Sequence, residues 1–250
     1  MICVIGGSGF YNFLEDVENK IIETPFGEVS VEVGKIQNKD VIFLPRHGKR
    51  HSIAPDQINY RANIFTAHLL KTEMIFATNA VGSIRQSISP GSFVTPDHII
   101  DLTHGRKSTF FDGTGLSLTT IKGKKLSGVV HVDVSDLFDL KLRNLIKQSG
   151  LKLGMKILEQ GTLVVTNGPR FESPAEIKAY GLWGGDFVGM TSAPEAFLAK
   201  ELGIPYATLA VITNYAAGLQ SNVTADEVFE LFKSKINDVK SIIKKAIIAS

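Results

Sequence analysis

The sequence predicts one α/β domain in which a mixed, largely buried β-sheet is flanked by helices. Short apolar runs rich in Val, Ile and Phe alternate along the chain with longer stretches of helical periodicity. The length of 250 residues, 44% of them hydrophobic, is enough to bury one substantial core. Because the chain shows no internal repeat and no low-complexity linker, we expect this domain to span residues 1–250.

The expected elements follow from the length and the period of the apolar runs. Strands are expected where a short run is rich in β-branched or aromatic residues, at 1–5, 41–44, 74–79, 161–166, 186–190 and 206–213. Helices are expected where apolar residues recur every three or four positions, at 61–71, 138–149, 174–182, 193–202 and 225–248. Three of these helices begin with a capping-box pattern, Ser or Thr followed by Glu three residues later, at Ser173, Ser192 and Thr224. The polar, Gly-rich segment 104–128 is expected to form a surface excursion or a hairpin.

Composition limits the partners and the compartment. The 27 basic and 25 acidic residues give a net charge of +2, which is too even to indicate nucleic acid as a partner. No apolar run approaches the roughly 18 residues of a membrane-spanning helix, so no membrane partner is expected. The chain starts without a basic leader, and its single cysteine, Cys3, cannot form an intramolecular disulfide. Together these features predict a cytoplasmic protein.

Several common cofactor and metal motifs are absent. The glycines at positions 6, 7 and 9 would need a further glycine at position 12 to make a dinucleotide-binding motif, and Asn12 stands there. The six histidines include no HExxH pair, and one cysteine cannot build a thiolate zinc site. The sequence therefore predicts neither a metal nor an organic cofactor.

Hydrogen-bond donors gather at the ends of the predicted strands. In chain order they are Ser8, Arg46, His47, Asn79, Ala80 and Thr191, with backbone amides counted at Ala80. A guanidinium can bind two oxygens of one phosphate, and an imidazole can add one more contact. Because ligands of open α/β sheets gather at the carboxyl ends of strands, these residues predict a site for a mobile inorganic anion.

A second group of side chains suits a purine. Phe171 is an aromatic ring beside Glu172, Met190 precedes Thr191, and Asn214 follows the last predicted strand. An ionised carboxylate only accepts hydrogen bonds, so Glu172 suits the N1–H group of a 6-oxopurine such as hypoxanthine or guanine. The amide of Asn214 both donates and accepts, and its N–H groups suit N7 and O6 of the same base, which both accept hydrogen bonds.

These residues lie in stretches that resemble the trimeric purine nucleoside phosphorylase and methylthioadenosine phosphorylase family. The stretches are "GGSGF" at 6–10, "RHG" at 46–48, "NYRAN" at 59–63, "GPRFESPAEIKAYGLWGGDFVGMTSAPE" at 168–195 and "TNYAAG" at 213–218. The resemblance covers most of the chain and implies the nucleoside phosphorylase fold and a homotrimer or a dimer of trimers. It also implies reversible phosphorolysis of a nucleoside, with inorganic phosphate bound by the six strand-end residues as co-substrate.

The same resemblance implies a role for each residue of the base site. Phe171 would stack on the purine, Met190 would lie beneath the ribose, and Glu172, Asn214 and His47 would be the catalytic residues. The adenine-using branch of the family carries two aspartates in a "TDYD" segment, where this chain has Asn214 and Ala216. The resemblance therefore implies a preference for the 6-oxopurine nucleosides inosine, guanosine or 5′-methylthioinosine.

The region expected to contact the 5′ end of the ribose is apolar. Nucleoside-preferring relatives place a histidine where this chain has Ala225, and Val228 and Phe229 lie one helical turn further on. An apolar wall of this kind fits a 5′-methylthio group, although Val228 and Phe229 also fit the core stripe of a helix. His131 is similar to a family residue that reaches the 5′ region of a neighbouring subunit.

Three other functions stay open at this point. The chain could be an adenine-specific S-methyl-5′-thioadenosine phosphorylase, which would require Glu172 to be protonated or turned away. It could be a nucleosidase that uses water, although water needs no guanidinium such as that of Arg46. It could also be a non-catalytic nucleoside-binding protein.

Overall fold

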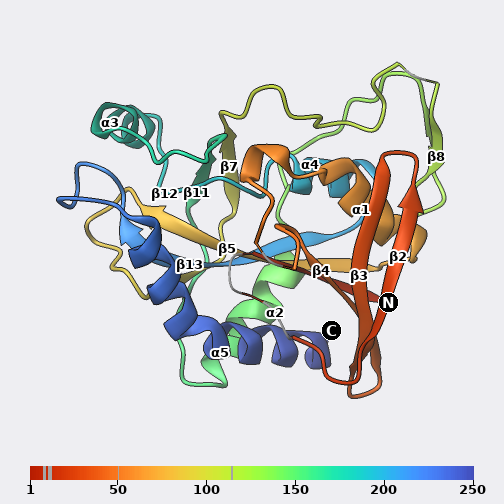
Figure 1. The fold of residues 1–250 in the computed structure, drawn as a ribbon, viewed down its shortest axis with the longest axis horizontal. Coiled ribbons are helices and arrows are strands. Elements are labelled where there is room, and N and C mark those ends of the chain that lie inside the picture. Colours follow the sequence, from red (N-terminus) through yellow and green to blue (C-terminus); the bar gives the residue numbers. More distant parts are fainter. Residues whose placement is uncertain (8–9, 11–12, 50, 114) are drawn as a thin grey trace.

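The computed structural model describes residues 1–250 except 8–9, 11–12, 50 and 114, so the predicted phosphate ligand Ser8 lies outside the described residues. The strands of the main sheet are β1 (Ile2–Gly6), β2 (Glu18–Thr24), β3 (Gly27–Ile36), β4 (Lys39–Pro45), β5 (Met74–Ser83), β6 (Phe93–Val94), β7 (His98–Asp101), β10 (Ile157–Leu158), β11 (Thr162–Val165), β12 (Phe187–Gly189) and β13 (Tyr206–Tyr215). The helices are α1 (Tyr60–Leu69), α2 (Leu140–Leu151), α3 (Pro174–Leu182), α4 (Glu195–Glu201) and α5 (Ala225–Ala249), with a 3₁₀ turn, η1, at Pro55–Gln57. Helices cover both faces of the sheet (Figure 1), as the α/β prediction requires.

The sheet is mixed, with its parallel strands at the centre. Its main path runs β10-β6-β13-β5-β1-β4-β3-β2, while β12 joins β5, and β11 lies between β12 and β7. β1 is parallel to both β4 and β5, and β5 is parallel to β13. The strands β2, β3 and β4 extend the sheet in an antiparallel manner. Among the described residues, this single sheet of eleven strands confirms the prediction of a mixed, buried sheet.

The hollow that holds the site arises from unequal strand lengths. β1 stops at Gly6, level with Pro45 of β4, whereas the ten-residue strands β5 and β13 continue past that level. β12 pairs antiparallel with the extension of β5, with Val188 opposite Gly82. The carboxyl ends of β1 and β4 therefore face an open space, which the extended halves of β5 and β13 line from the side.

Two apolar layers hold the helices on the sheet. On one face, α1 and α4 pack against residues such as Ile5, Ile42 and Tyr206. On the other face, α2 and α5 pack against Val4, Phe43 and their neighbours. The apolar residues of α5 repeat every three or four positions, and Phe232, Val239, Ile243 and Ile247 are all buried, as its periodicity predicts.

The capping predictions have three different outcomes. At α3, Ser173 and Glu176 form the complete capping box. At α5, the Thr224 side chain accepts from the amide of Glu227, whose carboxylate instead accepts from Gln220. The third prediction is wrong, because α4 begins at Glu195 after Pro194, and Ser192 has the left-handed φ of 85°. An N-cap residue needs an extended backbone, so Ser192 cannot cap α4.

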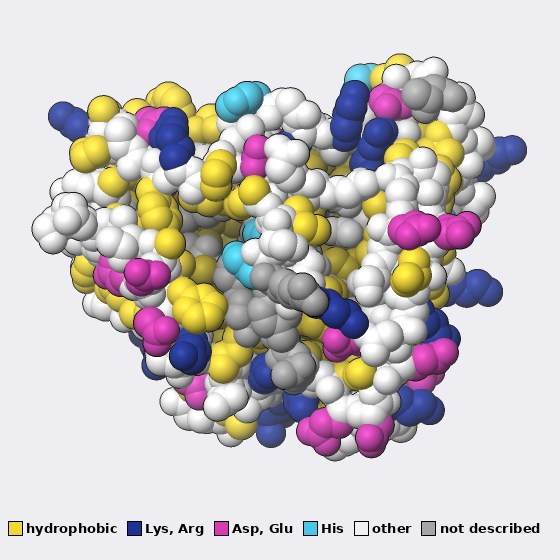
Figure 2. All heavy atoms as spheres, in the orientation of Figure 1, with side chains coloured by type: hydrophobic (Ala, Val, Ile, Leu, Met, Phe, Trp, Pro, Cys, Tyr) yellow, Lys and Arg dark blue, Asp and Glu magenta, His cyan; other side chains and the backbone are white. Residues whose placement is uncertain are grey.

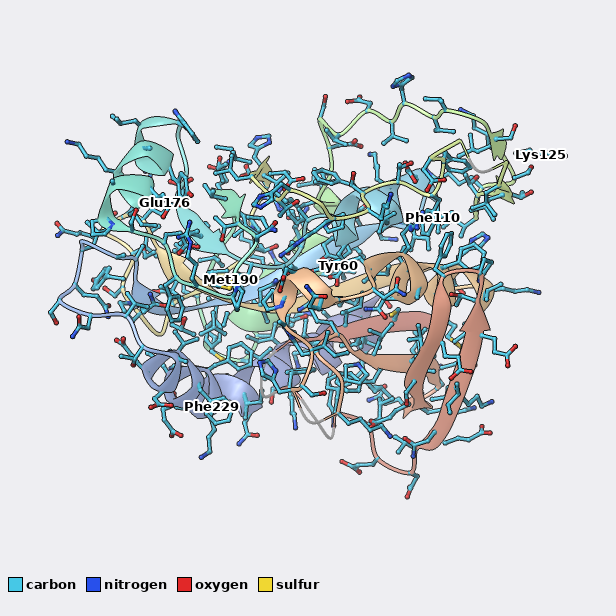
Figure 3. All side chains as sticks on the ribbon, turned by 45° about the horizontal axis from the view of Figure 1, so that its top comes forward. Tyr60, Phe110, Lys125, Glu176, Met190 and Phe229 are labelled. Atoms are coloured by element: carbon cyan, nitrogen blue, oxygen red, sulfur yellow. The ribbon has the colours of Figure 1, made fainter. Side chains whose placement is uncertain are left out.

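The segment 104–128 is a hairpin anchored to the core. β8 (Ser117–Thr119) and β9 (Lys125–Ser127) form the hairpin, which agrees with the prediction, and Figure 3 shows Lys125 at the periphery. Phe110 and Phe111 are buried beneath it, and the Phe110 ring lies 5.5 Å from that of Phe26. Within the described parts of the chain, no helix is both long enough and apolar enough to span a membrane.

Candidate active site

Most of the predicted site residues line one cavity of about 380 Å³ beside the ends of β1 and β4. Its volume lies in the range of small-ligand sites, and Figure 2 shows a hollow bordered largely by hydrophobic side chains. The predicted residues that line it are Arg46, His47, Asn79, Ala80, Phe171, Glu172, Met190, Thr191, Asn214, Ala216, Ala225, Val228 and Phe229. His131 is exposed on the segment after β9 and does not line this cavity.

Arg46 lines the cavity, but its guanidinium is not free as the sequence suggested. Its Nε and Nη2 donate to the two carboxylate oxygens of Glu195 at 3.0 and 2.6 Å, and Nη1 donates to the Thr78 carbonyl at 2.7 Å. Burial alone would lower the pKa of Arg46, yet the charge and the hydrogen bonds of Glu195 raise it. Among the described residues these bonds use three of the five N–H groups, and the positive charge is neutralised inside the protein, where the side chain is fully buried.

His47 is neutral and has a fixed tautomer. Its Nδ1 lies 2.8 Å from the Ile53 carbonyl, which can only accept, so Nδ1 carries the proton. Burial lowers the pKa of His47 to about 4, with smaller contributions from Arg46 and His51. At neutral pH Nε2 is therefore an acceptor, suited to a protonated oxygen of hydrogen phosphate rather than to a bare anion.

Asn79 holds Thr191 as a donor. Asn79 lies inside β5, not at a strand end as predicted, but it faces the cavity because the neighbouring β1 stops at Gly6. Its Nδ2 donates to the Thr191 hydroxyl oxygen, and its Oδ1 accepts from the hydroxyls of Thr208 and Ser192. Because the Thr191 oxygen already accepts a hydrogen bond, its own O–H is available to donate to a ligand.

Glu172 faces the cavity from the loop before α3. Its Oε1 accepts from the Thr166 hydroxyl at 2.7 Å, and as a carboxylate it can accept further hydrogen bonds from a ligand. Burial raises the pKa of Glu172, while the hydrogen bond from Thr166 lowers it. Glu172 therefore presents a carboxyl group to the cavity, and Ala216 supplies no second one beside Asn214.

Asn214 is oriented by two neighbours. It lies inside β13 just after a register shift between Ile212 and Asn214, where the sequence placed it beyond the strand. Its Oδ1 accepts from the Thr213 hydroxyl at 2.9 Å, and its Nδ2 donates to the Tyr215 carbonyl at 2.8 Å. Among the described residues the second N–H of Nδ2 has no partner, and it can donate to N7 or O6 of a purine, which both accept hydrogen bonds.

The far wall of the cavity comes from the start of α5. Ala225, Val228 and Phe229 line it, as predicted, and Figure 3 shows Phe229 on α5 and Met190 between α3 and α5. Met190 closes the floor against Gly168, where a side chain would come within 2.4 Å of the Met190 sulfur. Gly168 has a φ of 62°, a second reason for glycine at this position.

Sequence reasoning missed several contributors to the site. Glu195 was interpreted as a helix cap, although a fully buried glutamate needs a partner such as Arg46. His51, Pro55 and Asp226 also line the cavity, and their only signal was closeness to predicted site residues. Within the described residues, no group of three or more His, Cys, Asp or Glu side chains could hold a metal ion.

Comparisons with known proteins agree with this geometry. The 6-oxopurine nucleoside phosphorylase of Pyrococcus furiosus is 45% identical over 248 residues, which covers 98% of this chain and 91% of the relative. A "Probable S-methyl-5′-thioinosine phosphorylase" of Methanothermobacter thermautotrophicus is 40% identical over 253 residues, covering 99% and 83%. The structure of methylthioadenosine phosphorylase from Schistosoma mansoni in complex with adenine superposes with a TM-score of 0.90 at 31% identity, covering 99% and 91%. Residues 1–248 match the phosphorylase superfamily, and the chain therefore belongs to that family.

Proposed function

We propose that this protein catalyses the reversible phosphorolysis of 6-oxopurine nucleosides. Inosine, guanosine and 5′-methylthioinosine are the candidate substrates, and the products are the free purine and ribose 1-phosphate or its 5-methylthio analogue. The observation that carries this proposal is the base end of the cavity. The carboxylate of Glu172 and the oriented amide of Asn214 line the same cavity, and Ala216 stands in place of the second acid that a 6-amino group would need.

In the proposed reaction, one end of the cavity binds phosphate and the other binds the purine. Hydrogen phosphate binds near His47 and Thr191, with Arg46 as a further donor through the N–H groups that no described residue accepts. The glycosidic C1′–N9 bond breaks as positive charge builds on the ribose, and a phosphate oxygen bonds to C1′ from the face opposite the base. The electron pair of the broken bond passes to the purine, and Asn214 stabilises the resulting charge by donating to N7. Aimed dipoles of this kind are usually the largest catalytic contribution.

Glu172 selects the base and Phe171 supports it. The carboxylate accepts the N1–H of an oxopurine, while Phe171 stacks on the ring and Met190 lies beneath the ribose. Adenine presents an acceptor at N1, so a carboxylate opposite it leaves two acceptors facing each other, which costs about 1–3 kcal/mol. No covalent enzyme intermediate forms, and inorganic phosphate is the only co-substrate; we expect activity to survive dialysis against a chelator.

The 5′ wall favours 5′-methylthioinosine without excluding inosine. Ala225, Val228 and Phe229 offer an apolar surface, whereas Asp226, at the same end of the cavity, can accept from a 5′-hydroxyl. An apolar pocket discriminates weakly against an added hydroxyl, by roughly a hundredfold at most. We therefore expect both nucleosides to react, with the methylthio substrate preferred.

Initial rates on inosine, adenosine, 5′-methylthioinosine and 5′-methylthioadenosine, with and without phosphate, test the proposal. Phosphate-dependent turnover of the two inosines alone is the expected result. Equal or better turnover of 5′-methylthioadenosine would refute the base-site argument. Turnover that does not depend on phosphate would indicate a nucleosidase, and tight binding without turnover would indicate a nucleoside-binding protein.

We further propose that the protein is a cytoplasmic homotrimer or dimer of trimers. His131 lies away from the cavity of its own chain, and the large apolar side chains of Val129, Leu140, Leu182 and Trp183 are more than half exposed. Apolar surface of this kind is typical of protein interfaces when it is contiguous. The buried free thiol of Cys3 is compatible with a reducing compartment.

A further inference from the structure

We propose that Thr166, which does not line the cavity, is a positioning residue that keeps Glu172 ionised and thereby sets the preference for oxopurines over aminopurines. This inference rests on the proposed function, because it concerns the base that the same site accepts. It adds a residue to which the sequence analysis assigned no role.

Thr166 is held rigidly at the end of β11. Its amide donates to the Gly189 carbonyl at 2.9 Å, and its carbonyl accepts from Nη2 of Arg106 at 3.3 Å. The hydroxyl then donates to Oε1 of Glu172 at 2.7 Å. Because the amide and the carbonyl of Thr166 are both hydrogen-bonded, its backbone is fixed and its hydroxyl is held within reach of the Glu172 carboxylate.

Arg106 also secures the loop that connects Thr166 to Glu172. Its Nη2 donates to the Asn167 carbonyl at 2.8 Å and its Nη1 to the Ala193 carbonyl at 2.7 Å. The Asn167 side chain in turn exchanges two hydrogen bonds with the backbone of His104. The distance between Thr166 and Glu172 is therefore set by the scaffold.

The protonation state of Glu172 decides which base it fits. As a carboxylate it only accepts, and it pairs with the N1–H of an oxopurine. As a carboxylic acid it donates from one oxygen to N1 of adenine and accepts the 6-amino group at the other. Burial in an apolar cavity favours the carboxylic acid form of a glutamate, since burial penalises the charged form.

The hydrogen bond from Thr166 favours the carboxylate form of Glu172 instead. Burial raises the pKa of Glu172, and the Thr166 hydrogen bond is the largest effect that lowers it. Of the charged neighbours, Glu176 raises this pKa and Arg170 lowers it. Those two pair with each other at 2.7 Å, so their effects largely offset. The same cavity is also lined by Arg46, His47, His51 and Asp226. These groups are present whichever base is bound, so they affect both substrates alike.

Two variants separate the hydroxyl from the shape of the side chain. Thr166→Val removes the donor at nearly constant volume, and Thr166→Ser keeps it. The measurement is the ratio of kcat/KM for inosine to kcat/KM for adenosine, at saturating phosphate, across the pH range over which the protein stays folded. The titrations of phosphate and of His47 cancel in this ratio, because both substrates share them.

In the wild type, the ratio should fall as the pH drops through the pKa of Glu172. In Thr166→Val, the same fall should occur about one pH unit higher, since losing one charge-assisted hydrogen bond shifts a pKa by about that amount. At a pH on the falling limb this is a loss of selectivity of about tenfold. Thr166→Ser should keep the wild-type profile, and in a Glu172→Gln background Thr166→Val should no longer move it.

An unchanged pH profile in Thr166→Val, or an equal shift in Thr166→Ser, would overturn the inference. A shift that persists in the Glu172→Gln background would do so as well, because it could not act through that carboxyl group. Failure of the proposed function is a different result: the wild type would then show no phosphate-dependent turnover of inosine at any pH.

Discussion

Several side chains of this site are held in position by hydrogen bonds to other protein groups. Arg46 is the clearest case, because its guanidinium is paired with the carboxylate of Glu195. The Tyr206 hydroxyl donates to the same carboxylate at 2.7 Å. All three side chains are buried. The pair fixes the position of the guanidinium and leaves no net charge there, so in the proposed reaction phosphate would be held by hydrogen bonds more than by Coulomb attraction.

The buried pair predicts a large effect on stability. Glu195→Gln leaves the Arg46 charge buried without a counter-ion, which should lower the free energy of unfolding by about 3–5 kcal/mol. Urea denaturation measures this change. The matched control is Glu15→Gln, which removes an exposed partner of Lys244 at 3.8 Å and should cost less than about 1 kcal/mol. Equal effects in both variants would show that the Arg46–Glu195 pair contributes no more than a surface contact.

His47 predicts a pH dependence with a definite sign. Its pKa falls from 6.5 to about 4 on folding, so the unfolded chain binds the extra proton between these values. Stability must therefore fall as the pH drops below about 6.5, by about 2 kcal/mol between pH 7 and pH 5 from this residue.

His51 and His68 titrate in the same direction, so the wild type alone cannot isolate this contribution. The measurement is urea denaturation of wild type and His47→Asn at both pH values. His47→Asn should lose less stability on acidification than the wild type does. An identical loss in the two proteins would mean that His47 is not held neutral.

At the scale of secondary-structure elements, one residue ties together the segments that carry the site. Arg106 donates to the Tyr60 hydroxyl at the start of α1, to the Ala193 carbonyl before α4, and to the carbonyls of Thr166 and Asn167 after β11. Its guanidinium also lies 5.2 Å from the Tyr60 ring centroid. The segment before α4 is next to Thr191 and the segment after β11 leads to Glu172, so the spacing of these two cavity-lining residues depends on Arg106.

Arg106→Lys tests this role, because an ammonium cannot span the same fork of acceptors. We expect a loss of about 1–3 kcal/mol in unfolding free energy, together with a lower kcat/KM for inosine, because phosphate and base would no longer be held in register. Thermal or urea denaturation and steady-state kinetics provide the two readouts. Lys107→Gln, an exposed neighbour in the same segment, should change neither. Full activity in Arg106→Lys would mean that the two loops keep their spacing without it.

The elements that could be predicted from sequence are those whose signal is local. α3 occupies the predicted residues 174–182 because a capping box and a proline mark its first turn, and α5 is within one residue of its prediction because it has a capping residue and a clear apolar period. β6 and β10, of two residues each, exist only through pairing with distant strands and have no local pattern. β3 was missed although Val29, Val31 and Val33 alternate along it, a signal that the sequence does contain.

The same distinction applies to the site. About half of the cavity-lining residues could be predicted, because their chemistry and the family resemblance both point to them. The residues behind them were not, since Thr166, Thr208 and Glu195 become meaningful only through contacts of 6 to 149 positions in sequence separation. Thr166, six residues from Glu172, was near enough to consider, yet nothing in a Val-Thr-Asn sequence indicates a buried carboxylate as its partner.

At the scale of the whole molecule, the proposed assembly into trimers can be tested through the exposed apolar residues of the chain. Val129 is 73% exposed and lies two residues from His131, the residue expected to reach a neighbouring site. If a second copy covers this segment, Val129→Asp places a charge in the interface, which should reduce the assembled mass in light scattering. The KM for inosine should rise in parallel, because His131 would no longer be held at the neighbouring cavity.

Ile21→Asp is the matched control, since Ile21 is 69% exposed on β2, at the opposite end of the sheet from α3 in Figure 1. It should change neither the mass nor the KM. A reduced mass with an unchanged KM would separate assembly from the site and refute the role of His131. An unchanged mass in Val129→Asp would place the interface elsewhere on the surface, and the exposed pair Leu182 and Trp183 at the end of α3 would be the next segment to alter.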